Sequence, residues 1–291
     1  MIQFANEQTA ELVRSMWKIC FEDTDEFLDI LFTYKYKHEN TLIYFEEGEA
    51  VASLQMLPYT INFYRQEIPF AYMAGLCTLP KHRKKGYMAQ LLHEAHKVLA
   101  KRNIPLAILI PAEEWLYDFY KKYEYEQVFD KGENIIPVKE ILDTYSDNMD
   151  MAYQTFDQLF RFRDFCVQKN RNDFEAIAKE YKLDGYPEKR DLPGMARVID
   201  AWTLLDLYAK DNLSKKFRIK VTDCLQEDTP QIYSIDCGNV DLILESEDSF
   251  DIETDVRLLS RLLFGYKVHE LEEKQQRFFE DHQPIMNLML E

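Results

Sequence analysis

Hydrophobic residues recur every three or four positions in several stretches of the chain, which is the period of an amphipathic helix. The first stretch covers residues 8–37, and the acidic run at residues 23–26 divides it into two helices. Another lies within residues 80–103, where a basic loop leads into a helix. The apolar face of that helix comprises Leu91, Leu92, Ala95, Val98 and Leu99.

Between and after these helices, shorter apolar stretches predict strands. Residues 105–112 form a nearly continuous apolar run, which is typical of a parallel strand covered on both faces. A short aromatic helix and a last strand near residues 125–130 follow. We expect the remaining strands over residues 41–47, 50–57, 58–65 and 68–79, with Gly48 in a hairpin turn. The first part of the chain is therefore a mixed α/β domain.

The second half continues with a different order of elements. Residues 145–187 predict a helical connector that ends at Gly185 and Pro187. Beyond it, we expect helices over residues 195–210, 251–266 and 271–282, and strands over residues 217–223, 231–237 and 239–246. We therefore predict three parts: a domain of residues 1–144, a connector of residues 145–190, and a smaller α+β domain of residues 191–291.

Composition limits the classes of function. The chain has 291 residues, of which 46% are hydrophobic and 30% charged, as in ordinary globular proteins. Its formal net charge of −17 argues against nucleic acid and anionic membranes as partners. The five cysteines form no C-x-x-C pair, so a disulfide framework and a zinc site are not supported. Without a signal peptide or an apolar membrane span, we expect a cytoplasmic protein, and a homo-oligomer is compatible with the sequence.

One basic island interrupts this acidic chain. It comprises Lys81, Arg83, Lys84, Lys85, Lys97, Lys101 and Arg102, against the single acid Glu94. Its densest part precedes the helix, where free backbone N–H groups and the helix dipole favour an anion. Gly86 allows the backbone to turn there without a Cβ. The alternative is a solvated charge run that merely caps a helix. The G-x-x-x-x-G-K-[ST] and G-x-G-x-x-G patterns are absent, which argues against nucleotide hydrolases and Rossmann enzymes.

The segment LCTLPKHRKKGYMAQLL resembles the coenzyme A motif of the GNAT N-acetyltransferases, in which a strand leads into Arg/Gln-x-x-Gly-x-Gly/Ala and a helix. Arg83 matches the first position and Gly86 the glycine, while Met88 stands where Gly or Ala is usual. The resemblance implies acetyl-CoA as the cosubstrate and a mixed sheet that splays at the coenzyme. It implies the following coenzyme-binding residues: Leu76, Cys77, Thr78, Arg83, Lys84, Lys85, Gly86, Tyr87 and Met88.

The order of the later segments resembles the Eis-type acetyltransferases, which end in a domain similar to sterol carrier protein. The middle part is much shorter here than in the larger members of that group. Acetyl transfer benefits from a proton donor for the departing thiolate. The resemblance places Tyr120 in that role, although Tyr120 could also be one of several aromatic residues that pack one face of a helix. As in Eis-type proteins, the terminal carboxylate of Glu291 is the candidate base, and the alternative is a tail that completes the core.

We therefore expect an enzyme that transfers an acetyl group directly to a primary amine of a cationic small molecule or a lysine-like acceptor. No acyl-enzyme is needed, so Cys77 is not proposed as a nucleophile. Asp25, Glu26 and Glu114 are candidates for lining the acceptor pocket. We expect no metal, because His93 and His96 have metal-ligand spacing but no evident third ligand. The alternatives are a non-catalytic acyl-CoA sensor and a lipid carrier that works through its C-terminal domain.

Overall fold

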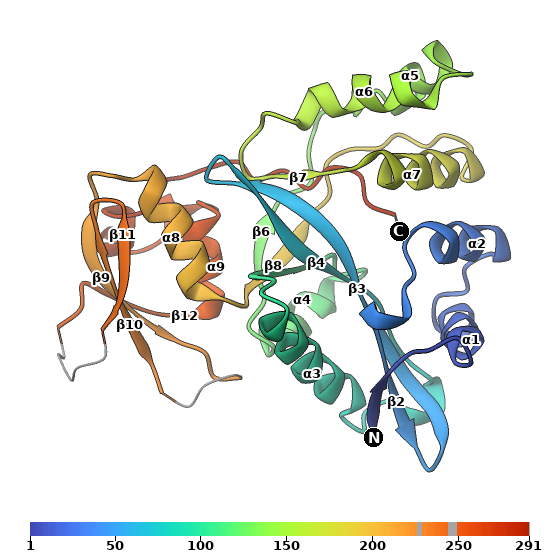
Figure 1. Cartoon of the computed structure of the whole chain (residues 1–291), viewed down its shortest axis with the longest axis horizontal. Coiled ribbons are helices and arrows are strands. Elements are labelled where there is room, and N and C mark those ends of the chain that lie inside the picture. Colours follow the sequence, from blue (N-terminus) through green and yellow to red (C-terminus); the bar gives the residue numbers. More distant parts are fainter. Residues whose placement is uncertain (226–228, 244–248, 291) are drawn as a thin grey trace.

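The computed structural model describes residues 1–225, 229–243 and 249–290, and it contains two β-sheets. The large sheet has the strand order β1-β2-β3-β4-β5-β8-β6, with β7 paired to β3 (Figure 1). Its strands are β1 (Ile2–Phe4), β2 (Thr41–Glu46), β3 (Glu49–Phe63), β4 (Gln66–Thr78), β5 (Leu106–Leu109), β6 (Glu126–Phe129), β7 (Cys166–Gln168) and β8 (Gly194–Val198). The expected mixed α/β architecture is confirmed.

Helices cover both faces of this sheet. Alternate residues of a strand point to opposite faces. On β3, Leu54 and Met56 pack in one cluster with α3 (Tyr87–Lys101) and α4 (Glu114–Lys121). Leu57 and Tyr59 pack instead with the N-terminal helices α1 (Ala10–Phe21) and α2 (Asp25–Tyr34). The side chain of Thr24 caps α2 by accepting a hydrogen bond from the Phe27 N–H, which explains where the second helix begins.

β3 is a single long strand, whereas the pattern predicted two strands that meet at Pro58. Proline interrupts a strand because it has no N–H to donate. Here β2 pairs with β3 only as far as Gln55, and β7 pairs with it from Thr60 onward. Pro58 therefore lies between the two partners, where β3 needs no donor on that side. Its carbonyl accepts a hydrogen bond from Lys35 Nζ at 3.2 Å.

β8 is the second difference from the expected elements. Residues 195–198 were predicted as the start of a helix, but they form a fully buried strand between β5 and β6, antiparallel to both. The helix begins only at α8 (Ala201–Asp211), where Asp200 caps its N-terminus. A short buried apolar run has the same appearance in a strand as in a helix, so periodicity could not distinguish them.

Residues 145–190, the predicted connector, contain the helices α6 (Met149–Phe160) and α7 (Arg171–Leu183), and α5 (Val138–Thr144) lies just before them. The connector also contributes β7 to the large sheet. The side chains of Asn170 and Asp173 form a capping box at the start of α7.

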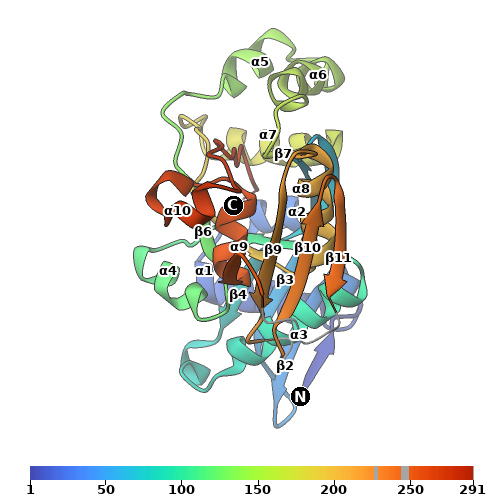
Figure 2. The ribbon, with the colours of Figure 1, turned by 90° about the vertical axis from the view of Figure 1, so that its left-hand side faces the viewer.

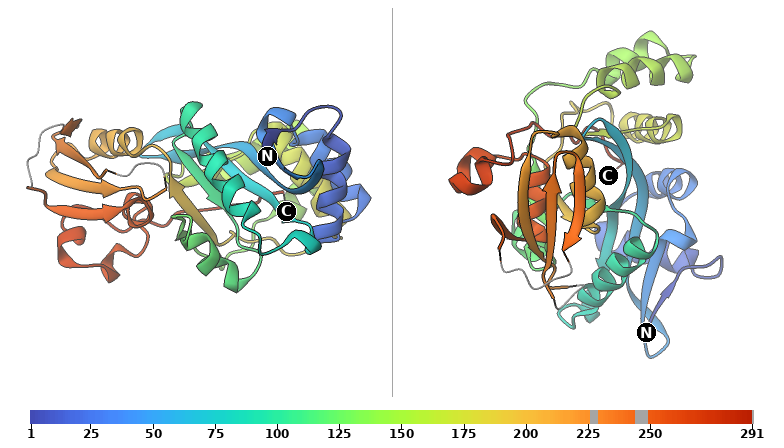
Figure 3. Two further views of the ribbon diagram at one scale, coloured as in Figure 1. Left: turned by 90° about the horizontal axis from the view of Figure 1, so that it is seen from below. Right: turned by 60° about the vertical axis from the view of Figure 1, so that its left-hand side comes forward.

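The small sheet has the order β11-β10-β9-β12, and Figure 2 shows β9, β10 and β11 side by side. It lies at the opposite end of the molecule from α1 and α2 (Figure 3). Residues 252–255 were predicted as helical but form β12, parallel to β9, before α9 begins. The elements of this region are β9 (Lys216–Thr222), β10 (Gln231–Asp236), β11 (Asn239–Ile243), β12 (Ile252–Asp255), α9 (Val256–Leu263) and α10 (Glu273–Gln276).

The C-terminal tail returns from the small sheet to the N-terminal helices (Figure 1). The Ile285 N–H donates to the Phe165 carbonyl at 2.8 Å, and the Ile285 carbonyl accepts from Val167 at 3.0 Å. Every residue from 286 to 290 is buried. The apolar tail is therefore docked against the body of the protein as far as Leu290.

Candidate active site

β4 and β5 diverge soon after they meet. Their parallel pairing consists of Ala71 with Ala107 and Tyr72 with Ile108. β5 ends at Leu109, but β4 continues to Thr78 with β3 as its neighbour. On the β5 side, the last residues of β4 have no strand partner in the described part of the chain. Their backbone groups are available to an extended ligand, which can add to a sheet edge as a strand does.

A β-bulge lies in the same part of β4. Ser53 and Gln55 of β3 pair with Cys77 and Ala74, so β4 has one extra residue between these pairs. Gly75 has a φ of +57°, which favours glycine. A Cβ there would lie 2.1 Å from Trp17 Cζ3, so glycine is also required for α1 to approach the strand. Such bulges frequently redirect a strand beside an active site.

The loop after β4 leads directly to the N-terminus of α3. Gly86 is the N-cap residue, with a left-handed backbone (φ +80°) and no capping side chain. The first N–H groups of a helix have no partner within the helix, and its dipole favours negative charge at this end. A phosphate group would satisfy both requirements. This helix start is therefore compatible with an anion, and the anion cradle stays a prediction.

The basic side chains of this loop do not all face an open site. Two of them contact the same carboxylate oxygen, Glu46 Oε2: Lys85 Nζ lies 3.1 Å from it and His82 Nδ1 lies 2.8 Å from it. The Tyr87 hydroxyl also donates to Glu46. These hydrogen bonds, first from Tyr87 and then from Lys85 and His82, lower the pKa of Glu46 to about 2. Glu46, which the sequence analysis did not single out, therefore offsets part of the island's positive charge.

Of the other residues predicted to bind the coenzyme, some could contact it through their side chains and others only through their backbone. Arg83 Nε donates to the Thr78 carbonyl at 3.1 Å, and its side chain is exposed beside the loop. Lys84 is exposed and forms no ion pair with the described residues. The Cys77 side chain is buried on the α1 face and lies 3.2 Å from Ser53 Oγ, so only the backbone of Cys77 can meet a ligand in the gap.

Tyr120 lies on α4, on the same face of the sheet as α3, and its side chain is only 7% exposed. Its ring contacts those of Phe119 and Tyr125. Burial raises the pKa of its hydroxyl above the ordinary value. The group is therefore protonated at neutral pH, as a proton donor must be. The packed aromatic face that was the alternative is also present, because Tyr120 belongs to the core cluster beneath α3.

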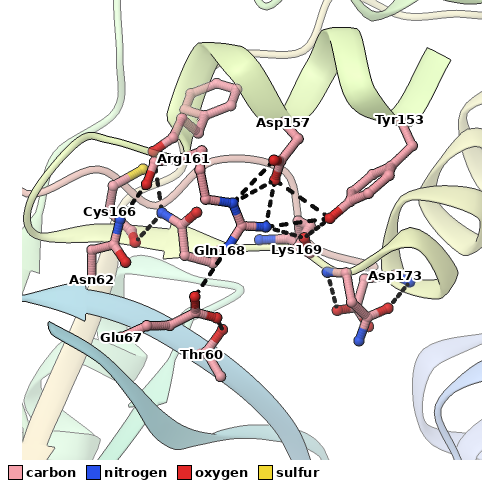
Figure 4. Close-up of polar contacts among 12 residues, drawn as sticks. Thr60, Asn62, Glu67, Tyr153, Asp157, Arg161, Cys166, Gln168, Lys169 and Asp173 are labelled. Atoms are coloured by element: carbon pink, nitrogen blue, oxygen red, sulfur yellow. Dashed lines mark hydrogen bonds and ion pairs between the residues drawn. The ribbon is translucent and has the colours of Figure 1, made fainter. Parts of the chain in front are cut away.

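A buried polar cluster under the tail was missed by the sequence analysis. Lys35 Nζ and Asp173 Oδ1 form an ion pair at 2.6 Å, with both side chains 5% exposed. Lys169 Nζ donates to Asn287 Oδ1 at 2.7 Å, and burial lowers the pKa of Lys169 to about 7. Figure 4 shows Lys169 and Asp173 beside the network of Arg161 and Asp157. No local motif marks this cluster, because its members come from distant parts of the chain.

The remaining candidates have ordinary structural roles or cannot be placed. Glu291 lies outside the described residues. Asp25 pairs with Lys18 at 2.6 Å on the surface, which lowers the pKa of its carboxyl, and Glu26 is exposed beside it. Glu114 lines a surface groove over α4 that also contains Trp115.

The two histidines of α3 are not brought together with a third ligand. His96 is buried, and its Nε2 lies 3.0 Å from the Tyr125 hydroxyl. The described residues contain no group of three or more potential metal ligands from His, Cys, Asp and Glu. They also include no helix that is long and apolar enough to cross a membrane.

Comparison with known families supports the same region. Residues 1–128 match the family model of an acetyltransferase (GNAT) domain. The match ends at β6, so it contains the gap between β4 and β5, the basic loop and Tyr120. The resemblance seen in the sequence is thus confirmed at the level of the GNAT domain. None of the curated proteins matches the chain.

Several solved structures share the fold over nearly the whole chain. A conserved protein from Enterococcus faecalis, described as a probable N-acyltransferase, has 14% identity and a TM-score of 0.66, with 99% of each chain covered. Eis1 from Mycobacterium abscessus has 12% identity and a TM-score of 0.63, covering 99% of this chain and 97% of that one. A GCN5-related N-acetyltransferase from Anabaena variabilis has 12% identity and a TM-score of 0.62, with the same coverage.

Identities this low show the fold alone. The C-terminal likeness to sterol carrier protein and the domain boundaries at residues 144 and 190 stay predictions.

Proposed function

We propose that the protein is an acetyl-CoA-dependent N-acetyltransferase that acts on a primary amine of a cationic small molecule or a lysine-like acceptor. The observation that carries this proposal is the divergence of β4 and β5 immediately before the glycine-capped N-terminus of α3. The gap suits an extended arm, and the helix start suits a pyrophosphate. The acidic net charge of −17 supports a cationic acceptor.

In this proposal, the pantetheine arm pairs with the backbone of Leu76, Cys77 and Thr78, and the pyrophosphate binds at residues 83–88. A backbone N–H of the bulged segment would stabilise negative charge on the thioester oxygen as the amine attacks. Tyr120 then donates its proton to the departing thiolate. The amine attacks the thioester directly, so no acyl-enzyme forms.

The proposed base is the terminal carboxylate of Glu291. The burial of residues 286–290 supports this choice, because it holds the preceding backbone in place between α7 and α2. The carboxylate would take the proton that the attacking amine loses.

The proposal is tested by calorimetric titration of the protein with acetyl-CoA. Arg83→Glu should weaken binding at least about tenfold, because a charge-assisted contact is replaced by repulsion. Lys97→Glu is the matched control: it changes the charge equally within the basic island, but Lys97 is exposed nearly three turns along α3 from Gly86. Equal affinities for both variants would show that the anion site is elsewhere.

Turnover separates the remaining hypotheses. With a panel of polyamines, aminoglycosides and lysine peptides, an enzyme should release free coenzyme A thiol at a rate that depends on the amine. Binding of acetyl-CoA without turnover on any amine would favour the sensor. Co-purified lipid without acetyl-CoA binding would favour the carrier.

A further inference from the structure

Two cysteines from distant parts of the chain meet where α1 packs on β4. Cys20 lies in the last turn of α1, and Cys77 lies on β4 beside the gap. Cys20 packs against the buried cluster that contains Cys77. Cys20 Sγ also lies 3.5 Å from the Thr78 carbonyl, and Cys77 Sγ lies 3.2 Å from Ser53 Oγ. The two thiols therefore lie in one packed region, with polar contacts to β3 on one side and to the end of β4 on the other.

This environment makes the two cysteines chemically different. Interaction with the neighbouring Cys77 thiol, assisted by Arg83, lowers the pKa of Cys20 to about 7 against the opposing effect of burial. The same interaction, together with burial, raises the pKa of Cys77. Cys20 is half-buried, whereas Cys77 is 3% exposed. Low-pKa, accessible thiols that contact a second cysteine have the features of an oxidation site with a resolving partner.

The other cysteines provide a contrast. Cys224 and Cys237 are both exposed. Partial desolvation raises the pKa of Cys224, and a hydrogen bond to Asp236 raises the pKa of Cys237. Burial raises the pKa of Cys166 to about 12. If exposure alone decided reactivity, Cys224 and Cys237 would react first. If thiolate character decides it, Cys20 reacts first.

We propose that Cys20 is an oxidation site for hydroperoxides and that Cys77 is its resolving thiol, so that oxidation forms a disulfide between α1 and β4. The Cys20 thiolate attacks one peroxide oxygen, the O–O bond breaks, and the leaving hydroxide takes a proton to become water. Cys77 loses its proton and attacks the sulfenic sulfur of Cys20. The S–S bond forms as the S–O bond breaks, and the second hydroxide leaves as water. One hydrogen peroxide thus accepts the two electrons of two thiols.

The disulfide would affect the coenzyme site directly. Cys77 adjoins Thr78, whose carbonyl accepts hydrogen bonds from both Arg83 and Cys20. Oxidation removes the ionisable Cys20 thiol beside Arg83 and ties β4 to α1 at the edge of the gap. This effect on the coenzyme site rests on the proposed function, and we expect the oxidised protein to bind acetyl-CoA more weakly.

The test exposes the reduced full-length protein to one equivalent of hydrogen peroxide at pH 7. Peptide mass spectrometry under non-reducing conditions should find the Cys20–Cys77 disulfide. Cys77→Ser should instead accumulate a sulfenic acid at Cys20 that reacts with dimedone, and Cys20→Ser should show neither product. Circular dichroism verifies that both variants are folded. Preferential oxidation of Cys224 or Cys237, or the absence of the linked peptides, would overturn the proposal.

Two further measurements separate the oxidation site from its consequence. Arg83→Gln should slow the alkylation of Cys20 by iodoacetamide roughly threefold or more, because the thiolate loses its cation. Acetyl-CoA titrations then compare the oxidised and reduced protein. A disulfide without any change in acetyl-CoA affinity would retain the oxidation site but refute its coupling to the coenzyme. If the reduced protein does not bind acetyl-CoA, the proposed function fails while the oxidation site stands.

Discussion

At the scale of single residues, two buried tyrosines on the same face of the sheet have different surroundings. The Tyr125 hydroxyl bonds to His96 Nε2, and its side chain is fully buried. The Tyr120 hydroxyl forms no hydrogen bond to the described residues, although the ring is nearly as buried. A hydroxyl that is held in the core without a protein partner is available to a ligand. This difference favours Tyr120 over Tyr125 as the proton donor.

Tyr120→Phe should lower turnover about 100-fold, the usual scale of acid–base catalysis, and leave acetyl-CoA affinity nearly unchanged. Its unfolding free energy should also change little, because no hydrogen bond within the protein is lost. Tyr125→Phe is the control. It should lower the unfolding free energy by about 1 kcal/mol, since it leaves His96 without its partner, but it should not lower turnover. Steady-state kinetics and denaturant unfolding distinguish the two; normal turnover in Tyr120→Phe would assign Tyr120 to packing alone.

At the scale of elements, the site depends on how β4 ends and how α3 begins. Gly75 places the bulge against Trp17, and Gly86 begins α3 with a left-handed backbone. Both glycines have positive φ, but their surroundings differ. A Cβ on Gly86 would meet no atom within 4 Å, whereas a Cβ on Gly75 would collide with the Trp17 ring. Substituting each of these two glycines in turn therefore distinguishes the cost of backbone strain from the cost of steric overlap.

Gly86→Ala should cost about 1 kcal/mol of unfolding free energy, the usual cost of a left-handed backbone for a residue with a Cβ. Gly75→Ala should cost more than about 2 kcal/mol, because the overlap with Trp17 adds to the same strain. Urea unfolding followed by far-UV circular dichroism measures both. Equal losses of unfolding free energy in the two variants would show that α1 shifts to accommodate the added methyl group without an energetic cost.

At the scale of the whole molecule, the docked C-terminal tail and the N-terminal helices both contact the connector. Lys169 follows β7, and its ammonium group bonds to Asn287 of the tail. Lys169 is almost completely buried, and a buried ammonium group is costly without a full counter-charge. The Lys35–Asp173 pair lies nearby: Lys35 Nζ is 3.5 Å and Lys169 Nζ is 5.3 Å from the centre of the Tyr59 ring. Tail docking is thus coupled to the protonation of one lysine.

This coupling predicts a pH dependence of stability. The pKa of Lys169 is about 7 in the folded protein and 10.5 ordinarily, so the unfolded chain binds more protons between these values. Stability should therefore rise with pH from 7 to 9, by about 2 kcal/mol from this residue. Lys169→Met should remove that part of the rise and leave the rest. Guanidinium unfolding at pH 7 and pH 9 gives the comparison, and identical pH profiles for the two proteins would contradict it.

Many of the elements and the basic loop before α3 could be predicted from the sequence because their signals are local. The period of the apolar residues identified α1, α2 and α3, and the acidic start after Glu22 separated the first two. The glycine and the basic residues before Tyr87 indicated an anion site, since a helix N-terminus has the same free N–H groups in any fold. The apolar run at residues 105–112 indicated a buried strand, and β5 lies within it.

The tertiary structure alone decided which distant segments meet. β8 inserts between β5 and β6, a choice that depends on partners far along the chain and not on its own five buried residues. The pairing of Lys169 with Asn287 spans 118 residues, and Cys20 meets Cys77 only because α1 packs on β4. Glu46 of β2 offsets part of the positive charge of the basic loop, and no sequence motif connects this strand with that loop. Such contacts have no periodicity or composition that marks them, because their energy comes from burial and charge in the folded molecule.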